Sequence, residues 1–503
     1  MNSRCTTRLT FCLAVLALPA SGPTAASLAQ QVAEEVDADI AAGTDLRFHG
    51  RGATAPAFVR SATVAGNYTD LPAQGSSGPE FGHAIAIDAD WLAVGAPGTL
   101  VDHGAGFGGI KPAGAIFLFR KQDGEWIPSQ RLTPATFGLA PRCGQAVALR
   151  GRHLLVGCPG TGSLPQPGNL QGGYAAWHLD QDTDNWVPLA IPAQTTAGSQ
   201  CGHAVALTGS NSDGMTRAAV GCPGWNSHQG RVLVHAYSDL GGSWGAASAR
   251  TAGNGSSNDR FGASVWIDQN SRANGYVRMA VGAPDKLDDL FPQTGRVYLF
   301  EGSALVEAAS LVGLTSQDRF GTSVALAGNT LVAGALGSIT SQCSSGSCGR
   351  VARYVRQGNG QWVFQDGGVA VNVGGTPPGV QPEMQFGSAV GIGFDNWIAV
   401  AAPRANGNGS SLPPAPVANV GMVELRRAGD GSASVDGNAW QAELRPGVVT
   451  GLQLGGGRFG TALDFSSSHL AIGYPLSGTL IGGRRGAVWI YEDDRIFGDG
   501  FEP

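Results

Sequence analysis

The chain has 503 residues, of which 42% are hydrophobic, so it holds enough apolar material for a large core. Only 14% are charged while 78 are glycine, a balance that disfavours salt-bridged helices and favours short strands joined by turns. The formal net charge of -6, without any run of lysine and arginine, excludes the electrostatic footprint of a nucleic-acid-binding protein. We therefore expect an all-β protein that binds no nucleic acid.

Residues 1–29 have the three-part plan of a secretory signal peptide. Arg4 and Arg8 precede an apolar stretch from Leu9 to Leu18, and small residues follow as far as Ala29. The apolar stretch is about half the roughly 20 residues that a membrane span needs, and no later segment is long enough. We expect export, with the mature protein secreted or displayed at the cell surface and no membrane span.

A short motif recurs after this segment. A Phe-Gly or Cys-Gly step is followed by an apolar run that ends in Gly-Ala-Pro or a close variant, and the steps begin 58 to 73 residues apart. The copies are Phe81-Gly82 with Gly95-Ala96-Pro97, Cys143-Gly144 with Gly157-Cys158-Pro159, Cys201-Gly202 with Gly221-Cys222-Pro223, Phe261-Gly262 with Gly282-Ala283-Pro284, Phe320-Gly321 with Gly334-Ala335-Leu336, Phe386-Gly387 with Ala401-Ala402-Pro403, and Phe459-Gly460 with Gly473-Tyr474-Pro475.

Each copy continues with two more strand signals. A glycine precedes an alternating strand, as at Gly114 to Phe119 and Gly486 to Tyr491, and a weaker fourth strand is often marked by a tryptophan such as Trp126 or Trp186. The first two strands are almost continuously apolar or small, as expected where sheets stack face to face. The pattern predicts a seven-bladed β-propeller of four-stranded antiparallel blades over residues 57–492.

The two ends of the repeat array complement each other. After the seventh copy only three strands remain before Tyr491, and residues 57–65 ahead of the first copy read as the missing outer strand. Pairing them would close the ring and remove a free sheet edge. Residues 30–56 are then an N-terminal linker. Residues 493–503 form a C-terminal tail that resembles short tags on some exported bacterial proteins, with an ordinary chain end as the alternative.

The cysteines support the hairpin at the start of each blade. Cys5 and Cys12 lie in the signal peptide, and in the two copies where Cys replaces Phe, the alanine of Gly-Ala-Pro is Cys as well. The first residue of one antiparallel strand faces the last of the next, for example Phe81 and Ala96 about a turn at Asp88 and Ala89, at a distance that a disulfide spans. We predict the pairs Cys143–Cys158 and Cys201–Cys222, and Cys343–Cys348 in a small loop after the fifth copy.

Phe-Gly followed by Gly-Ala-Pro is the signature of FG-GAP repeats, and the array resembles the seven-bladed propeller at the head of integrin α subunits. The resemblance implies an extracellular binding platform, with ligands on the face formed by the loops after strand two and before strand one. It also implies calcium in some loops between strands one and two. The candidate ligands here are Asn211 and Asp213 in the third copy and Asp268 and Asn270 in the fourth, without the full alternating set of carboxylates, and Asx-rich turns are the alternative. No other cofactor is expected.

Signals for catalysis are weak. Gly241, Ser243 and Gly245 match a nucleophile motif, but no helix pattern follows, so the turn reads as an ordinary one. His83 and His203 hold equivalent places after their motif steps and could meet near a propeller axis. No other catalytic constellation is apparent.

We therefore predict a monomeric binding and adhesion module that recognises an extracellular protein or glycan without catalysis. The alternative is an exported enzyme, a hydrolase or lyase with its site in the axial funnel. A structural component of a larger exported assembly is a third hypothesis, which a large exposed apolar patch would indicate.

Overall fold

Residues 44–503 form one compact unit. Within it the computed structural model describes residues 47–49, 58–64, 78–102, 110–133, 141–160, 172–209, 214–268, 276–287, 293–313, 315–338, 347–368, 383–393, 396–408, 416–427, 441–446, 456–479, 483–484 and 486–493. The predicted signal peptide, the predicted linker except for residues 47–49, and the predicted tail except for Asp493 lie outside these residues.

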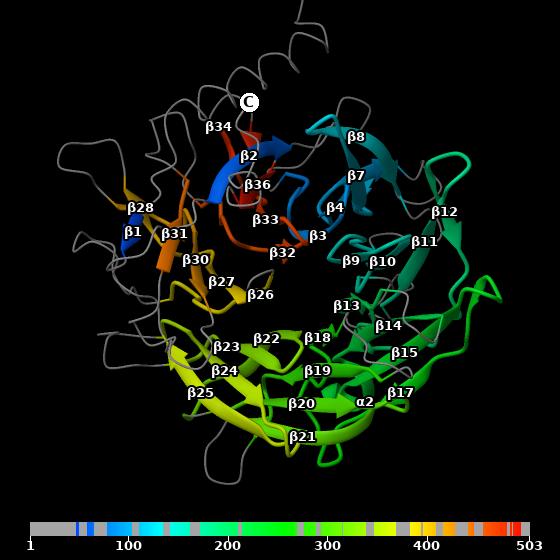
Figure 1. The fold of residues 1–503 in the computed structure, drawn as a ribbon, viewed down its shortest axis with the longest axis vertical. Coiled ribbons are helices and arrows are strands. Elements are labelled where there is room, and N and C mark those ends of the chain that lie inside the picture. The colour runs from blue at the N-terminus through cyan, green and yellow to red at the C-terminus, as the bar shows by residue number, and fades with distance from the viewer. Residues whose placement is uncertain are drawn as a thin grey trace, which may run out of the picture. The chain divides into compact units, whose positions relative to one another are not determined.

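The unit is a seven-bladed β-propeller, as predicted, with blades of antiparallel strands that Figure 1 shows around a common centre. The first four blades follow the chain without interruption, and their strands run from the centre outwards. Blade one is β3 (Ala84–Asp88), β4 (Trp91–Ala96), β7 (Ala115–Gln122) and β8 (Glu125–Leu132). Blade two is β9 (Ala146–Arg150), β10 (His153–Gly157), β11 (Tyr174–Asp180) and β12 (Asn185–Leu189). Blade three is β13 (Ala204–Leu207), β14 (Met215–Cys222), β15 (Arg231–Ser238) and a divided outer strand, β16 (Ser243–Trp244) and β17 (Ser248–Arg250). Blade four is β18 (Ser264–Ile267), β19 (Arg278–Ala283), β20 (Arg296–Glu301) and β21 (Val306–Val312).

Blade five also follows the chain, and the last two blades each include a strand from the N-terminal part of the chain. Blade five is β22 (Phe320–Ala327), β23 (Thr330–Ala335), β24 (Arg350–Arg356) and β25 (Trp362–Gly368). Blade six is β26 (Val390–Ile392), β27 (Trp397–Ala402), β30 (Met422–Arg427) and β31 (Gln441–Leu444), with β1 (Arg47–His49) added at its edge. Blade seven is β32 (Leu463–Phe465), β33 (His469–Tyr474), β36 (Ala487–Asp493) and β2 (Phe58–Val64).

Short elements decorate the connections between the second and third strands. They are the hairpins β5 (Leu100–Asp102) with β6 (Ile110–Pro112), β28 (Gly407–Asn408) with β29 (Pro416–Val417) and β34 (Gly478–Thr479) with β35 (Gly483–Arg484), and the turn α2 (Trp225–His228). The turn labelled α2 has left-handed angles at Asn226 and Ser227 and is not a regular helix. No helix among the described residues is long and apolar enough to cross a membrane.

The seven first strands form the innermost ring. Each contacts the first strand of the next blade, and β3 also contacts β32, so the circle is complete. The closing pair is β2 with β36, in the antiparallel arrangement predicted for the strand at residues 57–65. The additional strand β1 was not predicted, because three residues without apolar alternation carry no strand signal.

The recurring Phe-Gly or Cys-Gly step is a tight turn. In all seven copies the amide of the residue after the glycine donates a hydrogen bond to the carbonyl of the residue before the Phe or Cys, at 3.0–3.3 Å. The glycine has a φ between 84° and 89°, which suits the third position of a type II turn and strains any other residue. We call this four-residue element the motif turn.

The motif turn also joins neighbouring blades. The glycine before each third strand forms a parallel bridge with the Phe or Cys of the next blade; the pairs are Gly114–Cys143, Gly172–Cys201, Gly230–Phe261, Gly295–Phe320, Gly349–Phe386, Gly421–Phe459 and, closing the ring, Gly486–Phe81. A Cβ on Gly95, at the end of a second strand, would lie 2.1 Å from the carbonyl oxygen of Gly144 in the next motif turn. This close approach explains why six of the seven second strands have glycine at this position, blade six having Ala401 instead.

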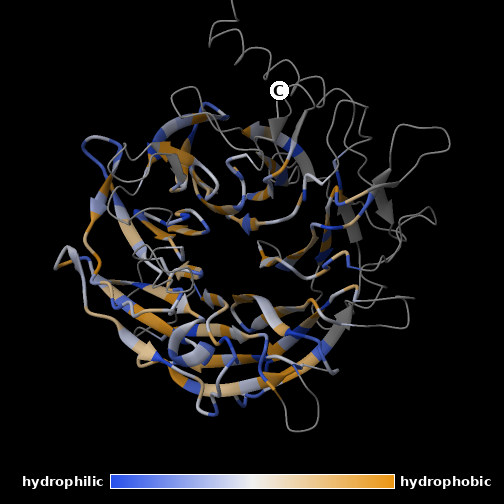
Figure 2. Ribbon diagram, turned by 180° about the vertical axis from the view of Figure 1, so that it is seen from behind, coloured by the Kyte–Doolittle hydropathy of each residue, from blue (hydrophilic) through white to orange (hydrophobic). Residues whose placement is uncertain are grey.

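The core lies between blades. Phe81 packs edge-on against Phe117 and Phe119 of its own third strand, with ring centroids 5.4 and 6.1 Å apart, in a cluster that also holds Ile490 of blade seven. Trp186, on an outer strand, is 1% exposed and packs against Trp91 of the preceding blade. Figure 2 shows the hydrophobic residues gathered along strands and many hydrophilic ones in the connecting turns.

The predicted register of the first hairpin needs one correction. Phe320 faces Ala335 as the sequence indicated, but Ser323 rather than Gly321 faces Gly334, because the motif turn shifts the register. In blade one this moves the turn from Asp88 and Ala89 to Ala89 and Asp90. The motif residues pair as predicted, and the strands beyond them are displaced by the turn.

Candidate binding site at the axial mouth

The motif turns place two sets of side chains on one face of the propeller. This face, which we call the loop face, carries the connections from strand two to strand three and from strand four to the next strand one. The residue before each Phe or Cys belongs to an outer ring: Glu80, Arg142, Gln200, Arg260, Arg319, Gln385 and Arg458. The residue after each glycine belongs to an inner ring at the ends of the innermost strands: His83, Gln145, His203, Ala263, Thr322, Ser388 and Thr461.

The outer ring has an unusual backbone. All seven residues have a positive φ, between 51° and 60°. Residues other than glycine and asparagine adopt this left-handed backbone region at a cost of about 1 kcal/mol each. Neither glycine nor asparagine occupies any of the seven positions, and four of them are arginine.

Two carboxylates partly neutralise the arginines of the outer ring. Glu80 lies 2.9 Å from a guanidinium nitrogen of Arg142, and Asp285 lies 3.1 Å from Arg319 and 3.7 Å from Arg260. The side chain of Arg458 forms no ion pair with any residue in the described part of the chain. Four arginines against two carboxylates leave the loop face positive at this ring, in a chain whose formal net charge is -6.

The inner ring is asymmetric. Its three large polar side chains come from blades one to three, where the amide nitrogen of Gln145 and Nε2 of His83 are 3.0 Å apart. Nδ1 of His83 also lies 3.8 Å from the carboxylate of Glu80. The hydroxyls of Thr322 and Thr461 bond back to their own motif turns. The inner ring surrounds the axial end of the propeller on the loop face, which we call the mouth. The inner-ring side chains with the greatest hydrogen-bonding capacity therefore lie on one side of the mouth, at blades one to three.

Both histidines of the inner ring are held neutral. Burial lowers the pKa of His203 to about 4, and the charges of Arg260 and His83 add to the effect. Burial also lowers the pKa of His83, where Arg142 and Arg458 act in the same direction against Glu80. Arginines of blades two and seven thus act on one imidazole, which places their positive charge around the mouth.

A small cavity of about 70 Å³ lies below the mouth, lined by residues of the first strands of five blades. At its wall a guanidinium nitrogen of Arg150 lies 3.4 Å from a carboxylate oxygen of Asp464, and both side chains are at least nine-tenths buried. The same carboxylate accepts the amide of Ile87 at 3.0 Å. The wall of this cavity thus contains a buried ion pair, which joins blade two to blade seven across blade one.

The structure describes only one of the four predicted calcium ligands. Asp268 is 5% exposed, and its amide donates to the carbonyl of Arg278. Asn211, Asp213 and Asn270 lie outside the described residues. No group of three or more His, Cys, Asp or Glu side chains with metal-binding geometry occurs among the residues that the structure describes.

Two predicted disulfides are confirmed. Cys143 is bonded to Cys158 and Cys201 to Cys222, and all four residues are fully buried at the loop-face ends of their hairpins. Cys348 is also disulfide-bonded, while its predicted partner Cys343 lies outside the described residues.

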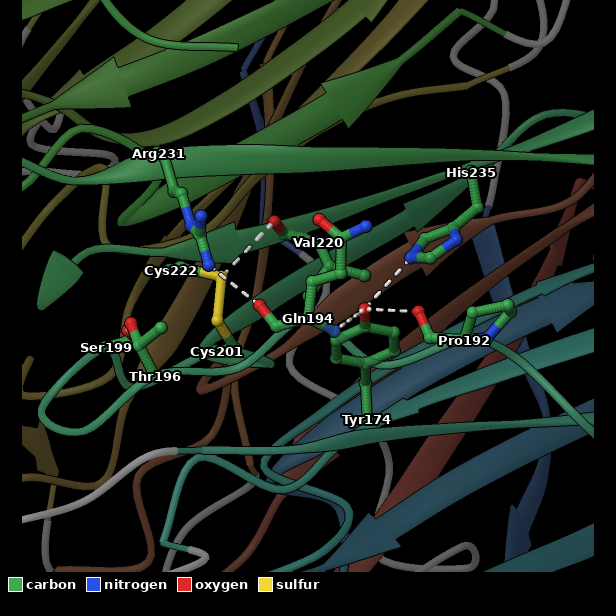
Figure 3. Close-up of a disulfide and its surroundings, with 10 residues drawn as sticks. All are labelled: Tyr174, Pro192, Gln194, Thr196, Ser199, Cys201, Val220, Cys222, Arg231 and His235. Atoms are coloured by element: carbon green, nitrogen blue, oxygen red, sulfur yellow. Dashed lines mark hydrogen bonds between the residues drawn. A yellow bond between two sulfur atoms is a disulfide. The ribbon is translucent and has the colours of Figure 1, made fainter. Parts of the chain in front are cut away.

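The Cys201–Cys222 disulfide lies beside side-chain hydrogen bonds that join blades two and three (Figure 3). The carbonyl of Gln194 accepts a hydrogen bond from Arg231 at 2.7 Å, and the hydroxyl of Tyr174 lies 2.9 Å from Nε2 of His235. This part of the loop face is therefore held by side chains as well as by the disulfide.

One serine–histidine–glutamate arrangement occurs at the opposite ends of the strands. Nδ1 of His469 is 2.8 Å from the hydroxyl of Ser468, and its Nε2 is 2.8 Å from both Glu492 and Nζ of Lys121. His469 is 5% exposed and the ring of Trp126 covers it, so a substrate has no access. We interpret the cluster as a polar contact between blades seven and one.

The serine motif at Ser243 is an ordinary hairpin turn, as its sequence context indicated. Ser243 begins β16 and pairs with Ser238 at the end of β15, and β17 rather than a helix follows. The outer-ring arginines were missed in the sequence analysis, although aligning the seven copies would have shown arginine before four of the motif steps.

Comparison with known proteins identifies no family for this chain. No protein-family model matches the chain, and no curated protein matches it. Among solved structures, the β-propeller domain of the Trilobed protease from Pyrococcus furiosus, described as having an open velcro topology, is similar at 9% identity and a TM-score of 0.38. The match covers 83% of this chain and 97% of that domain. FG-GAP membership stays a prediction from the motifs.

Proposed function

We propose that this chain is an exported FG-GAP-type propeller that binds an extracellular protein or glycan on its loop face, as a monomer and without catalysis. The observation that carries the proposal is the outer ring, where a residue other than glycine has a left-handed backbone conformation at all seven motif turns. Strain of this kind persists where the surrounding structure fixes it, and it is concentrated at binding sites.

The construction of the loop face agrees with a binding role. Rigid motif turns and buried disulfides support variable connections, and binding residues commonly lie on loops above such a scaffold. Disulfide bonds also fit an oxidising compartment outside the cytoplasm. The predicted signal peptide supports the same location.

A ligand screen tests the proposal. The exported protein would be passed over immobilised glycans and extracellular proteins, and any ligand found would be tested against a variant in which residues 100–112 are replaced by a short Gly-Ser linker. The control variant carries the same linker in place of Asp123 and Gly124, in the turn at the opposite ends of the strands of blade one. We expect binding to fall only in the first variant.

Two results would overturn the proposal. One is a ligand whose affinity falls in the control variant, with the linker in place of Asp123 and Gly124, but not in the variant that lacks residues 100–112. The other is turnover, detected as release of product from a panel of hydrolase and lyase substrates, at a rate that survives purification to homogeneity.

A further inference from the structure

The axial mouth concentrates positive charge with unused hydrogen-bonding capacity. Arg142, Arg260 and Arg319 remain about a third to two-fifths exposed despite their ion pairs. Arg458 is exposed and forms no ion pair within the described residues. Each guanidinium therefore keeps donors that an additional acceptor could reach.

Packing alone does not account for the arginines. The stem of Arg319 covers Gly337 in its own blade, where a Cβ would lie 3.3 Å from Cγ. Gln200 covers Gly224 in the same way with a shorter, uncharged side chain. The aliphatic carbons of either side chain are thus enough to cover the glycine at the end of the blade. Packing therefore does not explain why a guanidinium group recurs at four of the seven positions.

The neutral inner ring complements this charge. His203 has a pKa of about 4, so at neutral pH its imidazole offers one donor and one acceptor. Its ring forms no hydrogen bond with any described residue. A positive rim around neutral donors and acceptors fits a ligand that carries a carboxylate next to amide groups.

We propose that the two rings form a carboxylate-recognition site for an acidic peptide segment of an extracellular partner. This rests on the proposed binding function and specifies its ligand chemistry. The guanidinium fork binds carboxylates through paired, charge-assisted hydrogen bonds, and the inner-ring histidine and glutamine side chains would contact the neighbouring peptide groups. A peptide is favoured over an acidic sugar because neither ring contains a Trp, Tyr or Phe side chain on which a sugar ring could stack.

The test uses the exported protein and a fluorescein-labelled hexaglutamate peptide, with fluorescence anisotropy as the readout. Arg319→Gln, Arg458→Gln and the double variant remove charge from the outer ring. The matched control is Arg152→Gln, which removes an exposed arginine from the turn between β9 and β10, at the far ends of the strands. Thermal unfolding of each variant checks that it is folded, and Arg458→Gln alone carries the test if Arg319→Gln does not fold.

We expect the double variant to weaken hexaglutamate binding about tenfold or more, and the control less than twofold. Affinity should also fall steeply as salt is raised, because the site is partly exposed. Hexalysine should not bind. Equal losses in the double variant and the control would overturn the site, and so would the absence of hexaglutamate binding.

An oligogalacturonate competitor separates the two sources of carboxylate. Displacement of hexaglutamate by a much lower concentration of oligogalacturonate would overturn the peptide assignment. If the ligand screen finds a partner whose binding needs residues 100–112 but is unchanged by Arg319→Gln and Arg458→Gln, the carboxylate site is wrong while the binding function stands.

Discussion

The contact between neighbouring blades gives the sharpest test of the fold. In Gly95→Ala the new Cβ would lie 2.1 Å from the carbonyl oxygen of Gly144, about 0.9 Å closer than real Cβ atoms approach such a group. The obstructing atom belongs to the backbone of a motif turn, so it cannot rotate away. Gly95 does not have a positive φ, which leaves the close approach as the only source of strain. We expect a loss of about 3 kcal/mol in the free energy of unfolding, the upper end for overpacking.

Urea unfolding followed by tryptophan fluorescence measures this loss. Gly358→Ala is the matched control, because a Cβ there has no neighbour within 4 Å and the residue is exposed. Blade six provides the reverse test, since Ala401 already stands at the equivalent position, and Ala401→Gly should cost about 1 kcal/mol through lost packing and added chain freedom. If Gly95→Ala unfolds at the same urea concentration as Gly358→Ala, the proposed role of the glycine is wrong.

Three further changes test other parts of the structure. Replacing both Cys201 and Cys222 by alanine should lower the free energy of unfolding by about 3 kcal/mol, and reducing agent should then have no further effect at this bridge. His153 has a pKa lowered by burial to about 4, so its proton binds more tightly to the unfolded chain and stability falls as the pH drops from 6.5 towards 4. The wild type should therefore lose up to about 2 kcal/mol more than His153→Phe between pH 7 and pH 5 in urea titrations, and parallel losses would contradict this. Asp464→Ala should cost about 3 kcal/mol because Arg150 is left buried without its partner, whereas Arg150→Met combined with Asp464→Leu should recover most of that in thermal unfolding; an equal loss in both would refute the pairing argument.

The fold was predictable because the repeated residues carry backbone requirements. Gly82 and its equivalents are needed for a positive φ, so the motif marks the same point of every blade. The paired exchange of Phe and Ala for Cys143 and Cys158 indicated which residues face each other. The shift of register beyond Phe320 could not be predicted, since a turn and a continuous strand differ there only in backbone angles.

The candidate site was harder to predict. His83 and His203 were recognised as equivalent, but the approach of Glu80 to His83 depends on the direction of a side chain from a left-handed residue. Asp285 joins Arg260 to Arg319 from a different connection of the chain, and no local pattern links these three residues. The calcium hypothesis at Asp213 and Asn270 falls outside the described residues.

The closing strand has a consequence for the order in which the protein is completed. Ser61 of β2 donates a hydrogen bond to Ile490 of β36, across 429 positions of sequence. During synthesis β2 is therefore made long before its partner and must wait, unpaired, until the seventh blade exists. Every truncation upstream of β36 leaves an open ring and an unsatisfied strand, which gives a quality-control system a clear signal for incomplete chains.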